Sequence, residues 1–156
     1  MKIKWGKLIL CIAIPLVIGG AAGLISSGSM EDFAALNQPP LSPPGWFFPV
    51  AWSILYILMG IASYLVITSN GAQKHINNAI IIYAVQLLFN FFWTIFFFNL
   101  KLYFFSFAWL IALWILIIVT IILFSRLSKP AGYLLIPYLL WVSFAAYLNL
   151  GIALLN

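Results

Sequence analysis

Aromatic and amide side chains recur at helical spacing in three apolar stretches of the sequence. Positions i, i+4 and i+7 fall on one face of a helix, so each set forms a stripe. Indole and phenol rings stack on flat apolar molecules, and a few amides can hydrogen-bond to the polar atoms of such a ligand. The stripes therefore offer aromatic and amide chemistry. They are Gln86, Asn90 and Trp93; Trp52, Tyr56, Met59 and Ser63; and Trp141, Ala145, Leu148 and Asn149.

Other interpretations of these side chains remain open. Amides such as Asn90 and Asn149 also join helices by hydrogen bonds within lipid. An indole at the mouth of a helix, such as Trp46, also belongs to the aromatic belt at a membrane surface. Trp52 and Trp141 favour a binding role more strongly, because each lies several residues inside the outer end of its stretch and begins a stripe.

Few residues could perform other chemistry. No Asp, Glu, Lys, Arg or His lies deep within an apolar stretch, which argues against a proton relay or an ion-coupled carrier. The single His75 follows Lys74 in a polar break, so the sequence predicts no metal site. No pair of side chains is placed for acid–base or nucleophilic catalysis. Cys11 is the only cysteine and forms no disulfide framework.

The composition indicates that lipid surrounds most of the chain. Of 156 residues, 66% are hydrophobic and 6% charged, whereas about one quarter of a soluble domain is charged. Apolar runs of about 20 residues are long enough to cross a bilayer as helices. The alternation expected of a membrane β-barrel is absent. We therefore expect an all-α membrane protein, a single domain over residues 1–156, with spans at about 5–27, 46–68, 76–98, 102–125 and 131–155.

The positive charges predict the orientation of this bundle. Lys and Arg concentrate in cytoplasmic connections. With the N-terminus in the cytoplasm, the outer segments hold only Lys101, and the C-terminus lies outside. The basic residues are scattered between apolar runs, which argues against nucleic acid as a partner. The six Lys and Arg residues other than Lys101 lie in the inner segments: Lys2, Lys4, Lys7, Lys74, Arg126 and Lys129.

One connection, residues 28–45, is much longer than the others. The three tight connections predict that consecutive helices lie antiparallel and adjacent. A long loop in an economical protein tends to be functional. Proline fixes its own φ and restricts the residue before it, so a loop with four prolines should form a stiff lid over the outer end of the bundle. The prolines are Pro39, Pro40, Pro43 and Pro44.

Small residues are concentrated in the outer half of the first stretch. They leave room that aromatic rings on other helices could line. The spacing of Gly19 and Gly23 also fits a close-packing or dimer motif, and both interpretations remain open. The run is Gly19, Gly20, Ala21, Ala22 and Gly23.

Three motifs resemble one family. PPGWFFPVAWSILYILMGIASY, QLLFNFFW and PYLLWVSFAAYLNL are similar to segments of the translocator protein family, also called tryptophan-rich sensory proteins or peripheral benzodiazepine receptors. The resemblance covers the whole chain. It implies a five-helix bundle with a pocket opening toward the first loop, in the inner or plasma membrane of a bacterium. It also implies binding of protoporphyrin IX and of isoquinoline-carboxamide or benzodiazepine-type ligands, with no prosthetic group.

The resemblance also assigns roles to residues. Trp52 and Trp141 match the paired tryptophans tied to light- and oxygen-dependent porphyrin degradation in bacterial members. Trp46, Pro43 and Pro44 match the lid side of the site. The other implied ligand-binding residues are Ala22, Tyr56, Asn90, Trp93, Ala145 and Leu148.

The chain departs from the family pattern at two places. The tail LNLGIALLN after Tyr147 has no basic residue, so the cholesterol-recognition pattern of eukaryotic members is missing. The third span lacks the small-xxx-small spacing that forms dimers in some relatives, which leaves the face of a homodimer open. The sequence thus predicts a tetrapyrrole-binding receptor or sensor. A porphyrin or sterol transporter and a non-catalytic regulatory interaction protein are the alternatives.

Overall fold

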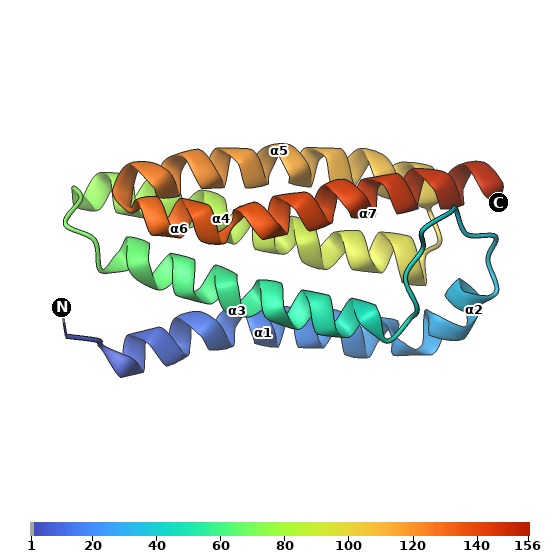
Figure 1. Ribbon diagram of the computed structural model, residues 1–156, viewed down its shortest axis with the longest axis horizontal. Helices are drawn as coiled ribbons and strands as arrows, with labels where there is room; N and C mark the ends of the chain where they lie inside the picture. The colour runs from blue at the N-terminus through green and yellow to red at the C-terminus, as the bar shows by residue number, and fades with distance from the viewer. Residues whose placement is uncertain (1) are drawn as a thin grey trace.

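All regular structure in residues 2–156, the part of the chain that the computed structural model describes, is helical. Five segments are long and apolar enough to cross a membrane, which confirms the prediction of an all-α protein with five spans. The long helices lie along one axis, and the two termini are at opposite ends of the bundle (Figure 1). The elements are α1 (Trp5–Ser26), the 3₁₀ turn η1 (Ser27–Ser29), α2 (Met30–Ala34), α3 (Phe47–Ile67), α4 (Gln73–Thr94), the π-helical turn η2 (Ile95–Asn99), α5 (Tyr103–Leu127), α6 (Lys129–Leu134) and α7 (Ile136–Leu155).

Two helix boundaries differ from those expected. The third span begins at Gln73 rather than at residue 76. The Gln73 side chain donates a hydrogen bond through Nε2 to Asn77 Oδ1 one turn later (2.7 Å). This first turn is polar, so hydropathy alone misses it. The last span is broken at Leu135 into α6 and α7. Pro137 has no backbone N–H for the carbonyl one turn earlier, and the helix is interrupted there.

The tight connections do not place all consecutive helices side by side. α3 packs chiefly on α1 and α6 and has few contacts with α4, so the expectation of adjacency is wrong for this pair. Glycines explain the partners. A Cβ at Gly60 of α3 would meet the backbone of Cys11 and Ile12 of α1, and a Cβ at Gly132 of α6 would overlap Ser125 of α5. Helices approach most closely where one of them lacks a side chain.

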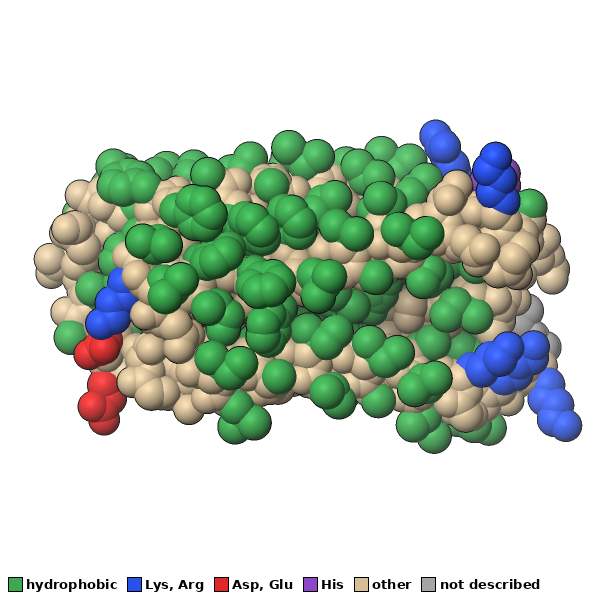
Figure 2. Space-filling model, turned by 180° about the vertical axis from the view of Figure 1, so that it is seen from behind, with side chains coloured by type: hydrophobic (Ala, Val, Ile, Leu, Met, Phe, Trp, Pro, Cys, Tyr) green, Lys and Arg blue, Asp and Glu red, His purple; other side chains and the backbone are tan. Residues whose placement is uncertain are grey.

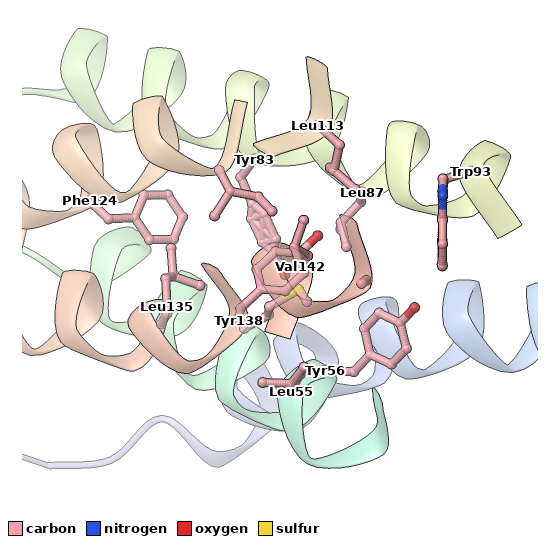
Figure 3. Packing of buried hydrophobic residues seen from close by; sticks show 14 of the residues in the cluster. Leu55, Tyr56, Tyr83, Leu87, Trp93, Leu113, Phe124, Leu135, Tyr138 and Val142 are labelled. Atoms are coloured by element: carbon pink, nitrogen blue, oxygen red, sulfur yellow. The ribbon is translucent and has the colours of Figure 1, made fainter. Parts of the chain in front are cut away.

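Tyr138 of α7 lies at the centre of the apolar core (Figure 3). Side chains from α3, α4 and α5 surround it, including Leu55, Leu87 and Leu113. Trp93 stands at one edge of this cluster (Figure 3). The core is therefore shared by four of the five spans, and its edge reaches the end of the bundle that carries the long loop.

Charges are confined to the two ends of the bundle. Figure 2 shows a body covered by hydrophobic side chains, with most Lys and Arg at one end and the acids at the other. At the acidic end, Lys101 Nζ lies 2.9 Å from Asp32 Oδ2, and this hydrogen bond raises the pKa of Lys101 above its usual value. The apolar body is suited to lipid, and the two ends are suited to the water on either side.

Candidate functional site

A cavity of about 410 Å³ opens between α1, α3 and α4. It lies in the half of the bundle that carries the long loop, the end at which the resemblance implies a pocket. Trp52 and Tyr56 of α3 and Trp93 of α4 form an aromatic wall. The volume of the cavity falls within the range of small-molecule sites, about 300–1,000 Å³. The α1 wall contains four small residues: Gly19, Gly20, Ala22 and Gly23.

The glycines of α1 have two different functions at this cavity. A Cβ at Gly19 would overlap the ring of Tyr56, so this glycine lets α3 approach α1. A Cβ at Gly20 or Gly23 would meet no atom within 4 Å. These two positions therefore leave the space open. Close packing within the chain and an open cavity wall both come from the same small-residue run.

Trp52 is the centre of the aromatic cluster. Its ring stacks on Tyr56, with centroids 5.6 Å apart and planes 24° from parallel. Its centroid lies 6.3 Å from that of Trp93. These contacts hold the indole within the cavity wall, where one side of it can face a ligand. Trp52, Tyr56, Trp93 and Ala22 are the predicted ligand-binding residues that line the cavity.

Trp141 touches Trp52 but lines a different space. The two indole centroids lie 6.3 Å apart with planes at 89°, an edge-to-face contact. Trp141 borders an apolar groove of about 450 Å³ between α3 and α7, together with Phe47 and Phe144. The predicted pair is thus brought together, yet each indole lines its own hollow. Within residues 2–156, Trp141 Nε1 is buried and has no hydrogen-bond acceptor.

The buried amides connect helices. Tyr56 OH donates to Asn90 Oδ1 (3.2 Å), and Asn90 Nδ2 donates to Tyr138 OH (2.8 Å). Tyr138 OH in turn donates to Gln86 Oε1 (2.7 Å). This chain crosses from α3 through α4 to α7. Asn90 is fully buried behind Tyr56 and does not line the cavity, so it orients a ring of the wall.

A second amide holds the other end of the aromatic wall. Trp93 Nε1 donates to Asn149 Oδ1 (3.0 Å), and Asn149 Nδ2 donates to the carbonyl of Tyr103 (2.8 Å). These bonds join α4, α7 and α5. Ala145 and Leu148 are buried on the same helix as Asn149 and do not line the cavity. Their ligand-binding role stays a prediction.

The long loop is anchored to the end of α7. Tyr147 OH donates to the carbonyl of Pro40 (2.7 Å). Asn37 N donates to Asn156 Oδ1 (3.1 Å), and Asn156 Nδ2 donates back to the carbonyl of Asn37 (2.9 Å). A Cβ at Gly151 would overlap Pro39, which packs directly on the helix. The loop is therefore held across the end of the bundle at which α7 finishes.

The residues implied for the lid side lie away from the cavity. Trp46 is 69% exposed and contacts the ring of Phe47. Pro43 is half-buried and Pro44 exposed, and neither lines the cavity. Phe33 of α2 takes the covering position instead. Its ring makes edge contacts with Phe48 and Phe98, which both line the cavity.

The π-helical turn η2 places residues that the sequence analysis missed. Such turns are rare and often occur at functional sites. Phe98, within the turn, lines the cavity. Asn99 joins the turn to α1, because its Nδ2 donates to the carbonyl of Ile25 (3.0 Å) and its Oδ1 accepts from Ser26 Oγ (3.1 Å). The aromatic run before Asn99 gives no periodic signal that would reveal the turn.

The cavity offers binding surfaces and few reactive groups. Its wall is aromatic, aliphatic and glycine, with hydroxyl groups from Ser26, Ser27, Ser53 and Thr94. No group of three or more metal-ligating side chains occurs among the residues that the structure describes. Stacking and exclusion of water are therefore the chemistry that this cavity can supply.

Residues 11–155 match the sequence model of the TspO/MBR family. The chain belongs to this family. The tryptophan-rich protein TspO of Chlorobaculum tepidum is 38% identical to it over 150 residues, which is 96% of this chain and 95% of the relative. The tryptophan-rich sensory protein of Cereibacter sphaeroides is 38% identical over 126 residues, or 81% and 77% of the two chains. The translocator protein of Ovis aries is 36% identical over 118 residues, or 75% and 70%.

Membership of the TspO/MBR family confirms the resemblance found in the sequence. Together with the five apolar helices, it makes the chain a multi-pass membrane protein. It supports a role as a sensor, receptor or transporter. The ligand, and the formation of a homodimer, stay predictions.

Proposed function

We propose that this TspO/MBR protein is a membrane receptor or sensor that binds a tetrapyrrole such as protoporphyrin IX in the cavity between α1, α3 and α4. The observation that carries the proposal is an aromatic wall facing glycines. Trp52 and Trp93 offer flat faces for stacking, and Gly20 and Gly23 leave the opposite side open. A planar macrocycle needs both features. Isoquinoline-carboxamide and benzodiazepine-type ligands have flat aromatic parts that suit the same wall.

The polar atoms of the cavity lining favour one orientation of the bound ligand. Protoporphyrin IX carries two carboxylates, which are costly to bury without partners. Ser26 and Ser27 lie at the end of the cavity nearest the loop. The macrocycle would stack in the apolar part, with its carboxylates directed toward the outer surface.

Light-dependent degradation of the bound porphyrin is the second part of the proposal. The porphyrin would be the photosensitiser, O₂ the oxidant and an indole the oxidisable partner, so the chemistry belongs mainly to the ligand. Trp52 lines the cavity, whereas Trp141 does not line it and only touches two lining residues, Trp52 and Phe48. Trp52→Phe should therefore slow degradation more than Trp141→Phe, and the double variant should retain binding but lose degradation. Equal rates in wild type and double variant would remove this mechanism.

We also propose a bacterial inner or plasma membrane as the location, with the N-terminus in the cytoplasm. Six of the seven Lys and Arg residues lie at the N-terminal end of the bundle. Such a bias is typical of the cytoplasmic side.

Titration of tryptophan fluorescence with protoporphyrin IX in the dark tests the binding proposal. Quenching should saturate in the wild type. Gly23→Phe should weaken binding at least tenfold, because the new ring fills the cavity.

Gly6→Phe is the matched control. Gly6 lies on the same helix at the opposite end of the bundle, and a Cβ there would also meet nothing within 4 Å. Its affinity should equal that of the wild type. Equal affinity in all three proteins would place the ligand elsewhere and contradict the proposal.

A further inference from the structure

A polar pocket of about 390 Å³ lies at the opposite end of the bundle from the tetrapyrrole cavity. It is formed where α3 ends, at the short connection to α4, and where α5 meets α6. Arg126 of α5 stands in its wall beside the polar groups of Thr68, Ser69, Asn70 and Ser128. No part of the proposed function uses this pocket.

The positive charge in the pocket has no counterion from the protein. Within residues 2–156, the single salt bridge joins Lys101 to Asp32 at the other end of the bundle. The side chain of Arg126 is exposed, and among the described residues it has neither a hydrogen-bond acceptor nor a carboxylate partner. The two acids of the sequence, Glu31 and Asp32, both lie at the far end. The pocket therefore has unused donors and a net positive charge.

The side chains around Arg126 match the groups that bind phosphate. A guanidinium presents several N–H donors in a planar fork that fits phosphate oxygens. The amide of Asn70 forms no hydrogen bond to another described residue and is exposed at the mouth of the pocket. Ser128 contributes a further hydroxyl. These groups lie around one pocket and can contact the same anionic headgroup.

The position of the pocket favours a lipid over a free anion. Leu65 of α3 and Leu127 of α5 form its apolar side. Both residues stand in the last turns of membrane-spanning helices, at the depth where glycerol and the first acyl carbons of a phospholipid lie. Basic pockets between spans on the cytoplasmic side commonly hold anionic lipid headgroups. A free phosphate has no apolar part to contact these two leucines, whereas a phospholipid has one.

We propose that this inner pocket binds the headgroup of an anionic phospholipid, with Arg126 as the principal contact to the phosphate. The site is independent of the tetrapyrrole cavity. It would fix one lipid at the junction of α3, α5 and α6.

Native mass spectrometry of the full-length protein tests this proposal. The protein is kept in detergent to which equal amounts of phosphatidylglycerol and phosphatidylcholine with the same acyl chains are added, and it is then freed of detergent in the mass spectrometer. The wild type should retain more phosphatidylglycerol than phosphatidylcholine. Arg126→Gln should lower that preference by about fivefold or more, because it removes the charge-assisted hydrogen bonds from the guanidinium to the lipid phosphate. Asn70→Ala should lower it by a smaller factor.

Lys7→Gln is the matched control, because it removes one positive charge from the same end of the bundle outside the pocket. Its lipid preference should equal that of the wild type. Equal losses in Lys7→Gln and Arg126→Gln would show a diffuse attraction and overturn the site, as would a wild type without preference. Displacement of the lipid by excess inorganic phosphate would make the free anion the ligand and would also overturn the proposal.

Discussion

Two aromatic side chains of the cavity wall, Tyr56 and Trp93, are each held by a hydrogen bond to a residue outside the cavity. Asn90 fixes Tyr56, and Asn149 fixes Trp93. Such bonds matter in a buried setting, because a polar group left without a partner costs about 1–3 kcal/mol. These two amides set the orientation of the rings, and the predicted contact of Asn90 with a ligand stays a prediction. Ring geometry at the cavity therefore depends on residues that do not line it.

Asn90→Ala tests this dependence. The substitution leaves Tyr56 OH without its acceptor and removes one of the two partners of Tyr138. We expect a loss of about 1 kcal/mol in stability, typical of hydrogen bonds between membrane helices, and weaker porphyrin binding. Thermal unfolding in detergent and dark titration measure the two effects.

Asn77→Ala is its control on the same helix. Asn77 is exposed and accepts a hydrogen bond only from Gln73. Both measurements should match the wild type. If Asn90→Ala also matches the wild type, the network does not support the cavity.

At the scale of helices, single glycines decide which spans touch. Gly60 brings α3 against the backbone of α1 in the half of the bundle that carries the N-terminus. In the half that carries the long loop, the glycines of α1 and the rings of α3 leave the cavity between them. The helices α1 and α3 are thus in direct contact at one end of the bundle and separated by the cavity at the other. This asymmetry creates a binding space without a break in either helix.

Gly60→Ala should separate α1 from α3. The new Cβ would meet backbone atoms of Cys11 and Ile12, which cannot rotate away as a side chain can. Overpacking of this kind costs about 1–3 kcal/mol. The midpoint of thermal unfolding should fall.

Gly20→Ala provides the comparison, since its Cβ would meet nothing within 4 Å. Higher helix propensity should stabilise this variant by up to about 1 kcal/mol. Equal destabilisation of the two variants would show that contact between α1 and α3 does not explain the effect.

Hydropathy was sufficient to predict the spans, because lipid requires a continuous apolar run in each. It could not predict which spans are adjacent, since that depends on contacts such as Gly132 with Ser125. The turn at Phe98 and the cover formed by Phe33 also require three-dimensional packing. Trp52 was identifiable from its motif.

At the scale of the whole molecule, the two ends of the bundle differ in charge and in the side chains that line their cavities. One end carries the acids, the anchored loop and the aromatic cavity. The other carries six basic residues and the polar pocket. Orientation in the bilayer therefore decides which compartment each site faces.

Thiol labelling of intact cells tests the predicted orientation. Both test positions are exposed, Glu31 in α2 and Lys74 in the first turn of α4, and the native Cys11 is buried. A membrane-impermeant maleimide should label Glu31→Cys from outside and should label Lys74→Cys only after the cells are opened. The reverse pattern would contradict a cytoplasmic N-terminus.

The most direct test of the central claim compares the two apolar hollows by the same chemical change. Gly20→Phe fills the cavity between α1, α3 and α4, and Ala51→Phe fills the groove that Trp141 lines. The dissociation constant of protoporphyrin IX is measured in the dark for each protein. We predict at least a tenfold increase for Gly20→Phe and no change for Ala51→Phe. The opposite result would place the tetrapyrrole in the groove between α3 and α7 and contradict the account.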